Sequence, residues 1–130
     1  MNAAFLLGRV LFGGFFLYSG INHFKSKQHM AGYTASKGVP APELSVLVSG
    51  LALIVGGASV ITGVKPKLGA TALLGFLATA SPLMHDFWNS QDPQARQNDL
   101  VHFSKNVALL GAALALAGVK EPWPAGLRLR

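Results

Sequence analysis

The chain of 130 residues carries a net charge of +6, with 51% hydrophobic residues and only 12% charged ones. Charges this few, confined to short segments between long uncharged stretches, argue against a soluble domain and predict an all-α integral membrane protein. The lack of cysteine excludes disulfides, thiolate nucleophiles and cysteine-held metal centres, and basic residues at the ends of apolar segments favour lipid headgroups over nucleic acid.

The first predicted span covers residues 3–24 and carries one charge, Arg9. It lacks the basic start and the cleavage motif of a secretory signal, so we expect a retained helix. A guanidinium this deep in an apolar helix must snorkel, pair with an anion or face a wet cavity. No acidic residue lies at a matching depth in the other spans. A lipid phosphate, a partner protein or an anionic ligand remains open as its counter-ion.

The segment 25–42 predicts a short interfacial helix that ends near Ser36, followed by a turn rich in glycine and proline. The second and third predicted spans follow at 44–64 and 68–88. The three-residue link between them predicts a tight helical hairpin. Pro82 should kink or end the third helix near its last turn.

The polar stretch 89–99 contains Asp92-Pro93 and predicts a surface loop before a fourth span at 102–119. The tail after Val119 predicts an interfacial anchor around Trp123 rather than a fifth span. A single transmembrane domain of four crossings over residues 1–130 is therefore expected, with an interfacial helix between the first two.

Small residues recur four positions apart and predict close helix packing in lipid. The pairs are Ala52/Gly56, Ser59/Gly63, Ala108/Ala112 and Gly111/Ala115.

Four crossings place both termini and the 65–67 link on one side of the membrane, and the two longer loops on the other. Each side carries five basic residues outside the first span: Lys65, Lys67, Lys120, Arg128 and Arg130 against Lys25, Lys27, Lys37, Arg96 and Lys105. The charge count therefore gives no majority. The short basic link and the basic tail favour cytoplasmic termini.

The same topology brings polar residues from three helix ends to one level of the membrane. The candidate ligand-binding residues are His23, His85, Asp86, Trp88, His102, Lys105 and Asn106, with Asn22 and Asn89 nearby. Such a cluster could bind a quinone headgroup, a haem or a metal, or relay protons. Each residue is also ordinary at a membrane interface, where polar ends meet headgroups and water. No two histidines have a local metal-ligand spacing, so no metal site is predicted.

Several segments in order resemble the DoxX family of small four-helix membrane proteins. They are GRVLFGGFFLYSGINHF, GVPAPE, GLALIVGGASVITG, HDFW and HFSKNVALLGAAL. The resemblance implies a bacterial inner-membrane protein with an oxidoreductase role, in some relatives as the membrane subunit of a thiosulfate:quinone oxidoreductase and in others beside redox-stress partners. By motif position, Arg9 and the seven candidate residues are carried over. Many members have an acidic residue in the second helix, whereas residues 44–64 have none.

Three hypotheses follow for the function. The first is an accessory subunit of a membrane redox system, with a quinone or small redox ligand at one mouth of the bundle and no covalent cofactor of its own. The chain has no flavin or nicotinamide motif, so it is not expected to be catalytic alone. The second is a carrier in which Arg9 lines a path for a small anion or metabolite. The third is a structural subunit of a larger complex. A redox partner protein and a homo-oligomer are both open.

Overall fold

The computed structural model describes residues 3–127, which fold entirely into helices and their connections. The elements are α1 (Ala3–Lys25), α2 (Lys27–Ser36), α3 (Pro42–Thr62), α4 (Pro66–Met84), the short 3-10 helix η1 (Phe87–Asn89) and α5 (Pro93–Ala117). Four helices are long and apolar enough to cross a membrane: α1, α3, α5 and α4 with the η1 turn. The predicted all-α membrane bundle, with a short helix between its first two spans, is confirmed.

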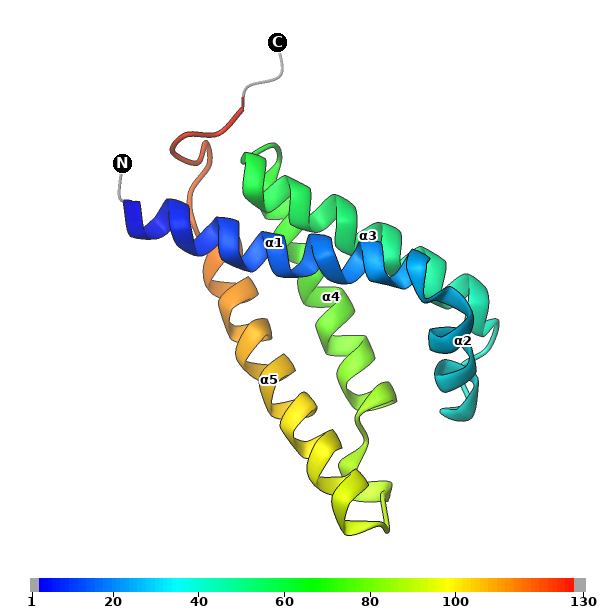
Figure 1. Cartoon of the computed structure of the whole chain (residues 1–130). Helices are drawn as coiled ribbons and strands as arrows, with labels where there is room; N and C mark the ends of the chain where they lie inside the picture. The colour runs from blue at the N-terminus through cyan, green and yellow to red at the C-terminus, as the bar shows by residue number, and fades with distance from the viewer. Residues whose placement is uncertain (1–2, 128–130) are drawn as a thin grey trace.

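The four long helices form two antiparallel pairs (Figure 1). α1 packs along α3, α4 packs against α3 and α5, and α2 folds back onto α3. The two pairs converge near the N-terminus and diverge toward α2 and the connection between α4 and α5 (Figure 1). The core lies where they converge and includes Phe16, Leu53 and Leu73. The bundle therefore has one closed end and one open mouth.

Glycines bring α1 and α3 into backbone contact. A Cβ built on Gly13 would lie 2.7 Å from the Gly57 carbonyl oxygen, and one built on Gly20 would lie 2.6 Å from the Gly50 carbonyl oxygen. These distances are well below van der Waals contact, so only glycine allows this approach. By contrast, a Cβ on Gly111 would have no neighbouring atom within 4 Å. Close packing at Gly111/Ala115 is therefore a wrong prediction within this chain.

The hairpin between α3 and α4 is as tight as predicted. Gly63 and Lys65 both have positive φ angles, 75° and 47°, and Pro66 opens α4 at its first position, where proline is tolerated. The Ser59 hydroxyl donates to the Val64 carbonyl at 2.7 Å. α4 ends at Met84, two residues beyond Pro82, as expected for a proline in the last turn.

The predicted surface loop 89–99 is wrong in its second half, because α5 begins at Pro93. The Asp92 side chain accepts a hydrogen bond from the Ala95 amide at 3.1 Å. Aspartate at the N-cap followed by proline at the first helical position is a strong start signal. The polar residues after Asp92 therefore form the first turns of the helix rather than a loop.

The interfacial-anchor interpretation of the tail is wrong for Trp123, which is only 3% exposed. Its ring packs against Phe5 with centroids 5.5 Å apart. The Leu127 amide donates to the Thr62 carbonyl at 2.7 Å, so the tail folds back over the closed end of the bundle. Arg128 and Arg130 of the predicted basic tail lie outside the described residues.

Candidate functional site

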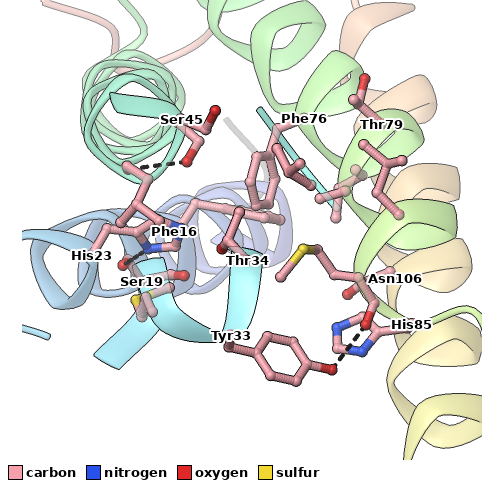
Figure 2. A pocket seen from close by; sticks show the side chains of 18 of the residues that line it. Phe16, Ser19, His23, Tyr33, Thr34, Ser45, Phe76, Thr79, His85 and Asn106 are labelled. Carbon is pink, nitrogen blue, oxygen red and sulfur yellow. Dashed lines mark hydrogen bonds between the residues drawn. The ribbon is translucent and has the colours of Figure 1, made fainter. Parts of the chain in front are cut away.

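A cavity of about 440 Å³ lies between the diverging helix pairs (Figure 2). All five α-helices contribute to it. Its polar lining residues are Ser19, His23, Tyr33, Thr34, Ser45, Ser49, Thr79, His85, Lys105 and Asn106. The rest of the lining is apolar, including Phe15, Phe16, Phe76, Leu77 and Leu83. An apolar cavity of this size with a few polar groups is typical of small-molecule sites.

His23 is buried on the α1 side of this cavity. Its Nδ1 lies 2.7 Å from the Ser19 carbonyl oxygen, one turn earlier in the helix. Its ring meets Phe76 edge-on, with centroids 6.2 Å apart. A Cβ on Gly50 would lie 2.7 Å from the Cβ of His23, so a glycine of α3 provides the room that this histidine occupies. The backbone and its neighbours therefore fix the His23 ring in place.

His85 lines the cavity from the end of α4, on the side opposite His23 (Figure 2). Its Nδ1 lies 3.3 Å from a carboxylate oxygen of Asp99. The His102 ring stacks on it, with centroids 4.9 Å apart and planes 22° apart. His102 itself is exposed and lies outside the cavity lining. A carboxylate partner on one nitrogen and a stacked ring on one face together orient His85.

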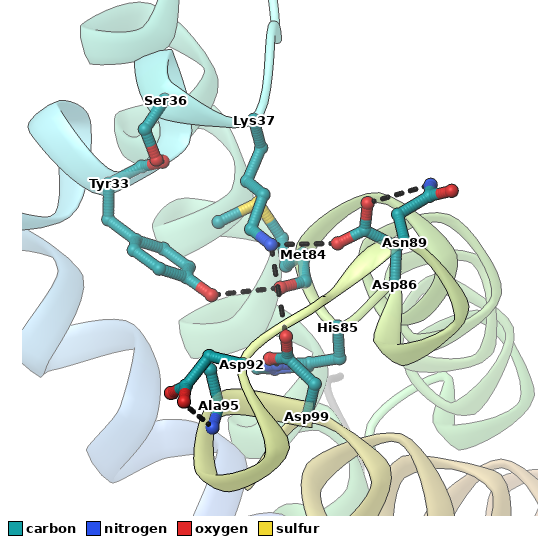
Figure 3. Close-up of polar contacts among 10 residues, drawn as sticks. All are labelled: Tyr33, Ser36, Lys37, Met84, His85, Asp86, Asn89, Asp92, Ala95 and Asp99. Carbon is teal, nitrogen blue, oxygen red and sulfur yellow. Dashed lines mark hydrogen bonds and ion pairs between the residues drawn. The ribbon is translucent and has the colours of Figure 1, made fainter. Parts of the chain in front are cut away.

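Lys37 joins the two loops of the mouth through its ammonium group (Figure 3). The Nζ atom lies 2.7 Å from Asp86 and 3.9 Å from Asp99. Asn89 donates a second hydrogen bond to Asp86 at 3.1 Å. The hydrogen bond to Asp86 raises the pKa of Lys37 above its ordinary value, although burial acts in the opposite direction. Asp86, a predicted ligand contact, therefore serves as the partner of Lys37 and does not line the cavity.

Tyr33 makes a second bridge across the mouth. Its hydroxyl donates to the Met84 carbonyl at 3.0 Å, and the Lys37 ammonium lies 5.6 Å from its ring centroid. Burial is the main cause that raises the pKa of Tyr33. Together the Tyr33 and Lys37 bridges hold α2 against the end of α4, so we call them the latch (Figure 3).

The remaining predicted residues at the mouth have different surroundings. Trp88 is 51% exposed and packs edge-on against Phe87 and Phe103, away from the cavity lining. Lys105 lines the cavity with its ammonium 5.6 Å from the Phe15 ring centroid. Asn106 also lines it. The cavity therefore brings together His23, His85, Lys105 and Asn106, whereas Asp86, Trp88 and His102 do not line it.

Arg9 lies at the closed end of the bundle, outside the cavity lining, and is 1% exposed. Its guanidinium donates to the Ile61 carbonyl at 3.1 Å, to the Ala125 carbonyl at 3.2 Å and to the Pro124 carbonyl. It also lies 5.7 Å from the Trp123 ring centroid. Backbone oxygens of this chain thus take the place of the missing counter-ion. The Arg9 side chain is therefore buried and does not snorkel. It does not line the cavity, although the carrier hypothesis requires it to line a path.

Sequence reasoning missed Tyr33, Lys37 and Asp99 as parts of this region. A usable signal was present, because the topology places the loops 25–42 and 89–99 on one side. The first loop is basic at Lys37, and the second is flanked by Asp86 and Asp99. Opposite charges in facing loops indicate ion pairs. The α2 bridge to Met84 has no sequence signal, because it depends on a backbone carbonyl.

The arrangement supplies hydrogen bonds and proton exchange through imidazole groups. In residues 3–127, no three histidine, aspartate or glutamate side chains lie close enough to hold a metal ion. The apolar walls and aromatic rings suit a flat, apolar ligand that carries a few polar atoms.

Comparison with protein-family models matches residues 4–86 to the DoxX family. The match includes α1 to α4, His23, His85 and Asp86, and stops before α5. No significant match was found among curated proteins or among solved structures.

Proposed function

This chain belongs to the DoxX family, and we propose that it is an accessory subunit of a membrane redox system with a quinone headgroup in the cavity. The observation that carries the proposal is the pair of oriented histidines, His23 and His85, on opposite sides of one largely apolar cavity. A quinone ring is flat and apolar with two oxygens at its edge. The cavity offers aromatic contacts for such a ring, and its imidazole nitrogens can bond to the ring oxygens when these carry hydrogen, in the hydroquinone form.

The accessory role follows from the chemistry that the chain carries. Hydrogen-bonding and proton-exchanging groups are present at the cavity, but the sequence has no cysteine and no nucleotide-cofactor motif. We propose that a soluble or membrane-bound redox partner supplies or accepts the electrons. α5 contributes one described buried residue, Ala113, so most of its surface is open to lipid, to a partner or to a second copy.

We further propose that the protein resides in a bacterial inner membrane as a single four-span domain with both termini in the cytoplasm. In that orientation the mouth of the cavity, with α2 and the latch, faces the opposite side of the membrane from the termini.

Titration of the purified protein in nanodiscs with a short-chain benzoquinone and with its chemically reduced hydroquinone tests the proposal. We expect saturable binding, and we expect His23→Ala combined with His85→Ala to weaken hydroquinone binding at least about tenfold, because two hydrogen bonds are lost. His29→Ala is the matched control, because His29 is exposed on α2 and does not line the cavity. Absence of saturable binding of both forms, or a double variant that binds both forms as tightly as the unmodified protein does, would contradict the proposal.

A further inference from the structure

The hydrogen bond of His23 determines which of its ring nitrogens can meet a ligand. A carbonyl oxygen only accepts hydrogen bonds, so the contact with Ser19 places the hydrogen on Nδ1. In the neutral ring Nε2 is then an acceptor. Nε2 has no hydrogen-bond partner within residues 3–127, and the side chain borders the cavity. His23, a lining residue of the cavity, therefore carries a lone pair rather than a donor on its second nitrogen.

His85 also has an acceptor at Nε2, because its Nδ1 carries the hydrogen. The Asp99 carboxylate accepts from Nδ1, which leaves Nε2 of the neutral ring as an acceptor. In the described part of the chain no side chain or carbonyl bonds to this second nitrogen. Two acceptors from different helices thus border one cavity, and each is fixed by a partner on its other nitrogen.

These acceptors discriminate between the two oxidation states of a quinone. The oxidised ring carries two carbonyl oxygens, which are acceptors and cannot bond to an imidazole lone pair. The reduced ring carries two hydroxyl groups, which donate. Building on the proposed quinone site, we infer that the cavity binds the hydroquinone form in preference to the quinone form. Two additional hydrogen bonds make the expected preference about tenfold or more.

Lys105 is the side chain of the cavity lining that can only donate hydrogen bonds, so it favours the quinone form. Its ammonium would favour a carbonyl oxygen, but it lies over the Phe15 ring and the residue is exposed. The hydroxyls of Ser45, Ser49 and Thr79 already donate to backbone carbonyls, so toward a ligand they are acceptors, as the histidines are. The Asn106 amide both donates and accepts, so it does not discriminate. Lys105→Met should therefore increase the preference for hydroquinone.

The test compares the dissociation constants of one short-chain benzoquinone and its chemically reduced hydroquinone, measured without oxygen in nanodiscs. We expect the hydroquinone to bind at least about tenfold more tightly to the unmodified protein. His23→Ala and His85→Ala should each lower this ratio, and His29→Ala should leave it unchanged. A variant that only disturbed the structure would weaken the binding of both forms equally, so the ratio of the two dissociation constants would not change.

The outcomes separate this inference from the proposed function. Binding of neither form would reject the quinone site itself. Binding of both forms with equal affinity, or tighter binding of the quinone, would reject only the preference inferred here. A ratio that both histidine variants leave unchanged would likewise reject the assigned role of the two acceptors.

Discussion

Arg9 is buried at the closed end of the bundle, where its guanidinium contacts two parts of the chain. It donates hydrogen bonds to the Ile61 carbonyl at the end of α3 and to the Pro124 and Ala125 carbonyls of the tail. Arg9 is therefore a structural anchor that ties the tail to α1 and α3.

Arg9→Leu should destabilise the protein by about 2 to 3 kcal/mol, because buried carbonyls lose charge-assisted hydrogen bonds. It should also release Trp123 toward solvent or lipid headgroups. In a Trp88→Phe background, Trp123 is the only tryptophan, so a red shift of its fluorescence reports the release. Arg96→Leu, at an exposed position of α5, is the control. An unshifted emission spectrum in Arg9→Leu would refute the anchor.

Lys37→Met should loosen the latch and cost about 1 kcal/mol, a modest figure because the ion pair with Asp86 is only partly buried. Hydrogen–deuterium exchange of the α2 amides should become faster. Because the pKa of Lys37 is raised, its contribution is complete below the ordinary lysine value of 10.5 and is lost as the pH rises through the raised value. Lys37→Met should not show that alkaline loss.

The matched control for the latch is Lys27→Met. Lys27 pairs with Glu43 at 3.2 Å, but that pair is far more exposed. We expect little change in α2 exchange for this variant. Similar acceleration in both variants would mean that general surface charge, rather than the latch, holds α2.

At the scale of the elements, the contact between α1 and α3 depends on glycine. Gly13→Ala should lower stability by about 1 to 3 kcal/mol, because its Cβ would overlap the Gly57 carbonyl and the Ile61 side chain. The adjacent Gly14→Ala should be tolerated, since its Cβ meets no atom within 4 Å. Thermal unfolding in detergent compares the two. Equal melting temperatures would contradict the close approach of these helices.

The elements also show how far sequence patterns reach. Uncharged length predicted four helices long enough to cross a membrane, because a bilayer requires that length, and the lysine–proline link predicted the hairpin. Polarity alone does not predict the start of α5, because the N-cap at Asp92 begins the helix within a polar stretch. The α1 glycines that contact α3, Gly13 and Gly20, are seven residues apart, so a four-residue small-residue pattern does not include them. Which glycines allow close backbone packing depends on which helices pair with each other.

At the scale of the whole molecule, divergence of the two helix pairs creates the cavity. Topology predicted that His23 and His85 would share a level, but not that His102 and Trp88 would remain outside the cavity. That distinction depends on helix rotation and crossing, which a single sequence does not specify. The cysteine-free chain makes the topology itself easy to test.

Single-cysteine variants Lys67→Cys and Gln91→Cys should react with an impermeant maleimide from opposite sides of the membrane, because they occupy opposite ends of the spans. With cytoplasmic termini, Gln91→Cys should label in intact spheroplasts and Lys67→Cys only after permeabilisation. Labelling of both from one side would contradict four crossings. The reverse pattern would contradict only the proposed orientation.

Photolabelling with an azido-quinone that has a short tail tests whether the cavity between the helix pairs holds the quinone ring. After illumination and peptide mapping, we expect adducts in the segments 15–34 and 76–85, which contain most of the cavity lining, and their loss on competition with unmodified quinone. Adducts confined to the segment 54–72, which forms another groove on α3 and α4, would show that the ring does not bind in the cavity.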